Sequence, residues 1–312
     1  FFGDQAGLTA TDASYSNFFG YYAGRLATNA ANSNFFGNQA GASATDASSA
    51  NFFGQDAGSG ATFASYSNFF GNGAGQNATN ATESNFIGQN AGNFAQFASN
   101  ANFIGLEAGL SATNATSSNF IGAYAGQNAT FASYSNFLGE NAGSSATNAT
   151  SSNFFGYQAG NSATNAANSN FFGTNAGQSA TGAFNTNCIG YYACNISGDG
   201  SNLNNGNFFG TNAARDAQYA TYSNFFGQNA GYGANTAANS IFIGTNAGLN
   251  DTVDNVFLET GASSILIGNN TNTGGFSNSI ALGTGARNTA AHQFVVGSST
   301  LDNAINEIYL GL

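Results

Sequence analysis

Apolar positions recur along this chain at a constant interval of 17 residues over roughly its first 190 positions. Each unit carries an Asn-aromatic-apolar-Gly motif. Its closing glycines are Gly3, Gly20, Gly37, Gly54, Gly71, Gly88, Gly105, Gly122, Gly139, Gly156, Gly173 and Gly190. The loops of a globular enzyme vary in length, whereas the coils of a solenoid must stack in register. The pattern therefore predicts an all-β protein, a parallel β-solenoid or β-roll with 17-residue coils.

The composition of the unit indicates which elements each coil contains. Aligned on its glycine, the unit reads Ser-Asn-Phe-(Phe/Ile/Leu)-Gly-x-x-Ala-Gly-x-x-Ala-Thr-x-Ala-x-x. Two glycines per unit, many Asn and Ser residues, and no apolar stripe of helical period argue against a helix. We expect two short strands, one at Asn-Phe-Phe and one at Ala-Thr-x-Ala, joined by turns in which glycine takes positive φ.

The two adjacent apolar residues of the first strand must point to opposite faces, so only one can enter the coil. The residue before the glycine, here called the second column, varies among Phe, Ile and Leu, a tolerance typical of an apolar interior. We therefore predict that the second column lines the coil interior. Its members are Phe19, Phe36, Phe53, Phe70, Ile87, Ile104, Ile121, Leu138, Phe155 and Phe172.

The residue before that, the first column, is Phe in all but one of the regular copies. If it faces outward, it forms an apolar ladder larger than a soluble monomer normally exposes. We therefore predict that the first column is buried between chains, along the axis of an oligomer. Its members are Phe18, Phe35, Phe52, Phe69, Phe86, Phe103, Phe120, Phe137, Phe154 and Phe171.

An asparagine precedes the Phe pair in every regular copy. Coils stacked about 4.8 Å apart bring such amides within hydrogen-bonding reach of one another. The predicted Asn ladder comprises Asn17, Asn34, Asn51, Asn68, Asn85, Asn102, Asn119, Asn136, Asn153 and Asn170. A threonine row from Thr11 to Thr164 has the same interval. A flat Thr face that binds ice or crystalline carbohydrate is a less favoured interpretation, because each coil has one ordered Thr rather than a Thr-x-Thr pair.

The two cysteines of the chain lie in one unit, where Cys188 replaces the first-column Phe and Cys194 replaces a Gly. This paired replacement suggests a disulfide across a single coil, which fits an extracellular or otherwise oxidising location. Two buried free thiols are the alternative.

The interval changes after Gly190, to 20, 17, 17, 24, 15, 14 and 14 residues. We divide the chain into a regular array at 1–194, a continued array with one insertion at 195–250, and an irregular transition followed by 14–15-residue coils at 251–312. The transition gathers Asp251, Asp254 and Glu259. Paired carboxylates can hydrolyse a glycan, but a cluster in such a loop is more often simply solvated. We predict no enzyme activity, no catalytic or metal site and no cofactor.

Charge narrows the possible partners. The chain has a net charge of −11 and its three cations are Arg25, Arg215 and Arg287. So few cations cannot neutralise nucleic-acid phosphates or bind an anionic membrane surface. No apolar run is long enough to span a bilayer as a helix. Because Phe1 falls midway through a unit, we expect the chain to be part of a longer polypeptide or a mature product cut within the array.

The later coils carry a different signature, Asn-Ser-Ile-Ala-Leu-Gly at residues 278–283. It resembles the head repeat of trimeric autotransporter adhesins, which also occurs in trimeric bacteriophage tail fibres, and the 14-residue spacing matches that family's coil length. The resemblance extends over roughly residues 239–312 and is looser over the 17-residue array, whose coils have three more residues and Phe where the family often has Ala. It implies a left-handed parallel β-roll with three chains packed about one axis, the first column corresponding to Ala281.

Together, the repeat and the resemblance predict an elongated homotrimeric rod that projects from a bacterial surface and mediates attachment to a surface glycan or protein receptor. A bacteriophage tail fibre and a subunit of an extracellular filament are the alternatives, so we expect a location at the cell surface or on a virion tail. Four tyrosines could contribute to shallow binding or could merely cover turns: Tyr21, Tyr22, Tyr191 and Tyr192.

Overall fold

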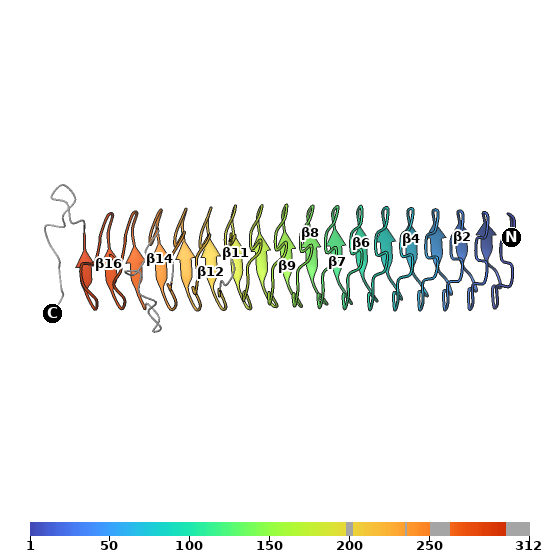
Figure 1. Ribbon diagram of the computed structural model, residues 1–312, viewed down its shortest axis with the longest axis horizontal. Helices are drawn as coiled ribbons and strands as arrows, with labels where there is room; N and C mark the ends of the chain where they lie inside the picture. The colour runs from blue at the N-terminus through green and yellow to red at the C-terminus, as the bar shows by residue number, and fades with distance from the viewer. Residues whose placement is uncertain (198–201, 235, 250–262, 298–312) are drawn as a thin grey trace. The chain divides into compact units, whose positions relative to one another are not determined.

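The computed structural model describes residues 1–197, 202–234, 236–249 and 263–297 as a parallel β-solenoid (Figure 1). Within those residues the regular secondary structure is short strands and turns, without a helix. The chain divides into two compact units, residues 1–162 and 163–312, which are described separately. The predicted solenoid of 17-residue coils is confirmed.

Each coil contributes one strand of three residues. In the first unit these are β1 (Asn17–Phe19), β2 (Asn34–Phe36), β3 (Asn51–Phe53), β4 (Asn68–Phe70), β5 (Asn85–Ile87), β6 (Asn102–Ile104), β7 (Asn119–Ile121), β8 (Asn136–Leu138) and β9 (Asn153–Phe155). In the second they are β10 (Asn170–Phe172), β11 (Asn187–Ile189), β12 (Asn207–Phe209), β13 (Asn224–Phe226), β14 (Ile241–Ile243), β15 (Ile265–Ile267), β16 (Ile280–Leu282) and β17 (Phe294–Val296).

Within each unit, every strand pairs in parallel with the next one along the chain, and equivalent positions stand opposite one another. Phe18 is paired with Phe35, for example, and Phe208 with Phe225. The longer intervals leave this register intact, because Cys188 still pairs with Phe208.

The predicted second strand is reduced to single-residue bridges. Thr45 pairs with Thr62, and the same row continues through Thr79 and Gln96. The reason is local, since Ser43 and Asp46 on either side of Thr45 both have positive φ, 57° and 48°. A strand cannot extend through residues in the left-handed region.

The two apolar columns occupy the faces opposite to those we predicted. The first column fills the coil interior, where all ten predicted Phe residues from Phe18 to Phe171 are fully buried within a single chain. The assignment of these residues to an axis between chains is therefore wrong. The second column, from Phe19 to Phe172, lies on the outer face of the strands and is partly exposed, so its assignment to the interior is wrong too.

Shape explains why the interior requires Phe. Successive first-column rings stack almost parallel, with 4.8 Å between the centroids of Phe18 and Phe35 and 3° between their planes. Each ring also lies against the glycine six residues later: a Cβ at Gly24 would be 2.4 Å from Cδ2 of Phe18. The rest of the interior consists of small residues such as Ala23 and Ala27, which are fully buried. In these coils a flat ring beside a residue without a side chain fills this space.

The Asn ladder is confirmed. Each side-chain amide donates to the amide oxygen of the next coil, as Asn17 Nδ2 does to Asn34 Oδ1 at 2.9 Å and Asn119 Nδ2 to Asn136 Oδ1 at 2.7 Å. The predicted members from Asn34 to Asn102 and Asn136 and Asn170 donate in the same way, and β11 and β12 continue the pattern. The ladder holds neighbouring coils in register along the outer face.

The disulfide between Cys188 and Cys194 is confirmed, and both residues are fully buried. They occupy the positions of a first-column ring and of its facing glycine, so the bridge takes the place of the ring–glycine contact. Leu203, also fully buried, stands where other coils have alanine. The larger leucine compensates for part of the volume lost with the ring.

Candidate functional site

The outer face of the strands is a regular surface that is partly apolar. It carries two parallel columns, the Asn ladder and the second column. In the second column of the first unit, Ile104 is 36% and Phe19 is 41% exposed, whereas Phe36 and Phe53 are less exposed. The rings of Phe19 and Phe36 stack at 4.8 Å along this face. A soluble monomer seldom presents a continuous apolar ladder of this kind, which favours a protein interface.

This face becomes wholly apolar in the last four strands. The asparagine of each strand is replaced by Ile241 in β14, Ile265 in β15, Ile280 in β16 and Phe294 in β17. The second column continues beside them, with Ile243 and Ile267 exposed. Ala281, which the adhesin resemblance aligned with the first column, is fully buried inside its own coil. The residues that could meet another chain are therefore its two neighbours on the strand, which point outward.

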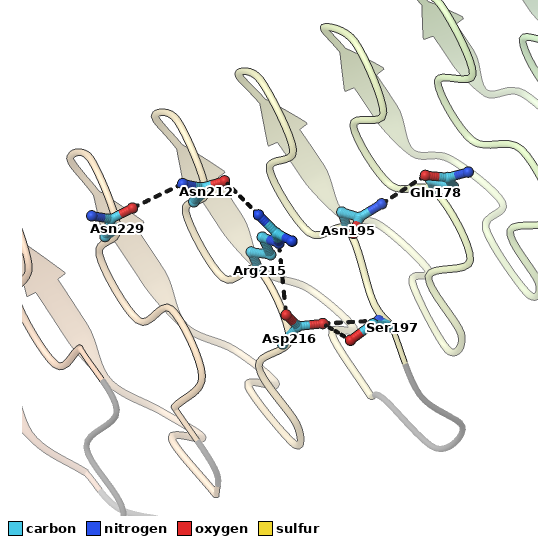
Figure 2. Close-up of polar contacts among 7 residues, drawn as sticks. All are labelled: Gln178, Asn195, Ser197, Asn212, Arg215, Asp216 and Asn229. Carbon is cyan, nitrogen blue, oxygen red and sulfur yellow. Dashed lines mark hydrogen bonds and ion pairs between the residues drawn. The ribbon is translucent and has the colours of Figure 1, made fainter.

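A second candidate is a polar cluster around Arg215 in the second unit (Figure 2). Arg215 Nε lies 3.6 Å from the carboxylate of Asp216, and Nη1 donates to Asn212 Oδ1 at 3.4 Å. Asp216 accepts hydrogen bonds from the backbone N–H and the hydroxyl of Ser197, at 2.8 and 2.6 Å. The cluster thus fastens the start of the first insertion to the following coil.

The guanidinium of Arg215 is also covered by aromatic rings, 4.8 Å from the centroid of Tyr192 and 5.6 Å from that of Tyr232. Amide ladders flank it: Asn212 donates to Asn229 at 2.9 Å, and Asn195 to Gln178 at 2.8 Å (Figure 2). The charge of Arg215 is therefore already engaged within the chain. We interpret the cluster as a structural clamp rather than a ligand site.

The predicted tyrosine pairs each have an arginine over the second ring, although Tyr21 and Tyr22 stack at 27° between ring planes and Tyr191 and Tyr192 meet edge to face at 78°. Arg25 lies 4.8 Å from the ring centroid of Tyr22, as Arg215 does from that of Tyr192. Tyr21 stacks on Tyr22, and the hydrogen bond to Tyr22 raises the pKa of the Tyr21 hydroxyl. Tyr22 and Tyr192 hold arginine side chains against turns, which favours the turn-cover interpretation.

Three features considered in the sequence remain: the carboxylate group, a metal site and a membrane span. Asp251, Asp254 and Glu259 lie outside the described residues. Among the residues that are described, no group of three or more His, Cys, Asp or Glu side chains is arranged to hold a metal ion. The same part of the chain contains no helix long and apolar enough to cross a membrane.

One surface feature was missed in the sequence. Exposed aromatic residues follow the threonine row in every second coil of part of the first unit, at Phe63, Phe97 and Phe131. The signal that could have found them is a 34-residue period superimposed on the 17-residue one.

Comparisons with protein-family models and with curated proteins found no match to this chain. The function of the chain is therefore inferred from the geometry described above and from the sequence resemblance of the later coils.

Proposed function

We propose that this chain is a structural and adhesive fibre protein, a homotrimeric β-solenoid displayed on a bacterial surface, where it mediates attachment. The observation that carries the proposal is the apolar outer face of the strands, above all in β14–β17, where both columns are apolar. Burying this face against copies of the chain removes it from water, as obligate homo-oligomers do.

Three further features support this proposal. The adhesin-head resemblance at residues 278–283 favours three chains rather than two. The Cys188–Cys194 disulfide suits an oxidising, extracellular environment. Stacked coils hide strand edges along their length, which makes the fold suitable for an exposed and protease-resistant stalk. The proposal assigns no catalytic activity to the chain.

A bacteriophage tail fibre is the second candidate, because the same head repeat occurs there and the mechanical requirement is the same. An extracellular filament built by end-to-end stacking is the third. The three differ in assembly and display rather than in the fold of the single chain.

The first experiment is the native mass of the full chain by light scattering on a sizing column. We expect about three chains, and we expect the triple variant Ile243→Ser, Ile267→Ser, Leu282→Ser to be monomeric. A matched control replaces three exposed apolar residues away from this face, with Leu26→Ser, Phe94→Ser and Tyr157→Ser, and should keep the wild-type mass. A monomeric wild-type chain would contradict the proposal, and large species of dispersed length would favour the filament.

A further inference from the structure

A row of exposed aromatic side chains occupies one corner of the coils in the first unit. Phe63, Phe97 and Phe131 are 54%, 51% and 55% exposed, and each directly follows a residue of the bridged Thr row. Tyr66 and Tyr134, each 64% exposed, lie three residues after the first and last of them. We call these five residues the aromatic ridge.

The stability of the fold does not explain why phenylalanine occupies these three positions. Phe63, Phe97 and Phe131 have φ of 48°, 51° and 50°, the left-handed region that disfavours bulky side chains. The intervening coils use Asn80 and Asn114 at the same position, both with φ of 50°, and asparagine tolerates that region far better. Because the Phe rings are half exposed, the free energy gained by burying them offsets little of the backbone strain. Strain that recurs without benefit to the fold indicates a contact outside the chain.

The backbone holds the rings in a fixed array. The carbonyl of Phe63 accepts a hydrogen bond from the hydroxyl of Thr82 at 2.8 Å, and that of Phe97 accepts one from Thr116 at 2.9 Å. The carbonyl of Phe131 is bonded in the same way by Thr150 at 2.9 Å. With coils stacked about 4.8 Å apart, rings in every second coil repeat at about 9.6 Å. The ridge is therefore a rigid, evenly spaced set of apolar platforms.

Polar groups alternate with these platforms. The side chains of Asn80 and Asn114 make no hydrogen bond to any described residue, unlike Asn29, which donates to Asp46 in the same row of earlier coils. Their amides are free to bond a ligand lying along the ridge. From residue 63 to residue 134 the charged residues are Glu83 and Glu107, and no cation occurs. An anionic polymer would find nothing to neutralise it, so the chemistry favours a neutral ligand.

We propose that the aromatic ridge binds an extended neutral glycan chain, in which pyranose rings stack their apolar faces on Phe63, Phe97 and Phe131. The spacing of two coils is close to the length of a disaccharide unit in an extended β-linked glycan. A regular polymer meets all three platforms at once, and a ligand without that repeat would meet only one. Hydroxyl groups between the stacked sugars reach the amides of Asn80 and Asn114. This inference rests on the proposed adhesive function and names the receptor class it would use.

The test is calorimetric titration of the full chain with β-linked hexasaccharides of glucose and of N-acetylglucosamine. We expect one of them to bind, each single Phe→Asn change on the ridge to weaken binding by about tenfold, and the triple variant Phe63→Asn, Phe97→Asn, Phe131→Asn to abolish it. Asparagine is the native residue at this position in alternate coils, so the variant should fold with unchanged or higher thermal stability. The matched control, Tyr21→Asn, Tyr157→Asn, Phe184→Asn, removes three exposed rings elsewhere and should bind like wild type.

Three results would overturn the inference. The first is that neither hexasaccharide binds, and the second is equal binding by wild type and the ridge variant. The third is a fall in native mass in the ridge variant, which would make the ridge a contact between copies of the chain. Failure of the proposed assembly is distinguishable: the ridge lies within one chain, so a monomeric protein could still bind the glycan.

Discussion

The strands β1–β10 present phenylalanine to the coil interior and a mixture of phenylalanine, isoleucine and leucine to the outside, and the two sides constrain sequence differently. Inside, each ring stacks on the rings of neighbouring coils and touches a glycine backbone, as Phe18 does with Gly24. Outside, Phe36 and Ile104 occupy equivalent positions in different coils, partly exposed. The inner side requires one shape, whereas the outer side requires only apolar character. Invariance therefore marks the packed side of this solenoid, and tolerance marks its surface.

The first-column position holds Leu266, Ala281 and Val295 in β15–β17. In the two coils of β11 and β12 the interior also changes, and there it changes in groups. Cys188 and Cys194 replace ring and glycine together. In the next coil Ala214 stands in the glycine position, the ring of Phe208 is tilted by 54° from that of Phe225, and Gly206 replaces the usual Ser. A single substitution in the interior leaves a clash or a void against the neighbouring residues. The substitutions found here therefore occur together with compensating substitutions at contacting positions.

The largest expected effect separates the two faces within one strand. Phe103→Ala removes a fully buried ring and should destabilise the chain by about 3–5 kcal/mol. Ile104→Ala, at the adjacent and half-exposed position, should cost about 1 kcal/mol or less in an isolated chain. Urea unfolding followed by circular dichroism measures both.

Measuring the stability of both variants at several protein concentrations distinguishes the inner face from the outer face. The loss caused by Phe103→Ala should not depend on concentration, because the contact lies within one chain. The loss caused by Ile104→Ala should grow as concentration rises if the outer face is an assembly face, since association stabilises the folded state by mass action. Equal losses for the two variants in dilute protein would contradict the assignment of inner and outer faces.

A smaller effect tests the contact between ring and glycine. A Cβ at Gly109 would lie 2.3 Å from Cδ2 of Phe103, at a φ of 64°. Gly109→Ala should therefore destabilise the chain by about 2–3 kcal/mol, combining left-handed strain with overpacking. Gly60→Ala is the matched control: its φ is similar at 68°, but the new Cβ would meet only the end of the Asn77 side chain. It should cost about 1 kcal/mol, the conformational part alone, and equal losses would mean that the ring contact is unimportant.

Much of this architecture could be predicted from the sequence. The 17-residue interval predicted the coil, and the invariant asparagine predicted the ladder that Asn17 and Asn34 begin. The pairing of Cys188 with Cys194 followed from their joint replacement of two regular residues. Each of these predictions depends only on residues that recur at a fixed interval or that are replaced together, and both can be read directly from the sequence.

Which of the two columns faces the coil interior could not be predicted from how freely each column varies among apolar residues. Volume-tolerant cores accept Phe, Ile and Leu in exchange, but a core built from one ring per coil against a glycine accepts only that ring. The decisive clue was available in the cysteines, because a bridge from 188 to 194 requires both positions to face the same interior. That places the first column inside. The outer face and the aromatic ridge needed the structure, since exposure at Phe63 or Ile104 depends on how the turns fold.

The smallest effect tests whether the coil of Phe208 is held by compensation. A Cβ at Gly206 would lie 2.4 Å from the tilted ring of Phe208, whereas the serine at this position in regular coils donates across the coil, as Ser33 Oγ does to the Ala47 carbonyl at 2.6 Å. Gly206→Ser alone should therefore destabilise the chain by about 1–2 kcal/mol through overpacking.

Adding Ala214→Gly should remove that cost, because the ring can then return to the flat position over glycine and leave room for the serine hydroxyl. The double-mutant cycle, measured by urea unfolding, should give a coupling energy of about 1–2 kcal/mol. Additive effects would mean that the tilt of Phe208 arises from the neighbouring disulfide rather than from Ala214. Coupling would show that this interior accepts change only when the ring, its facing residue and the residue behind it change together.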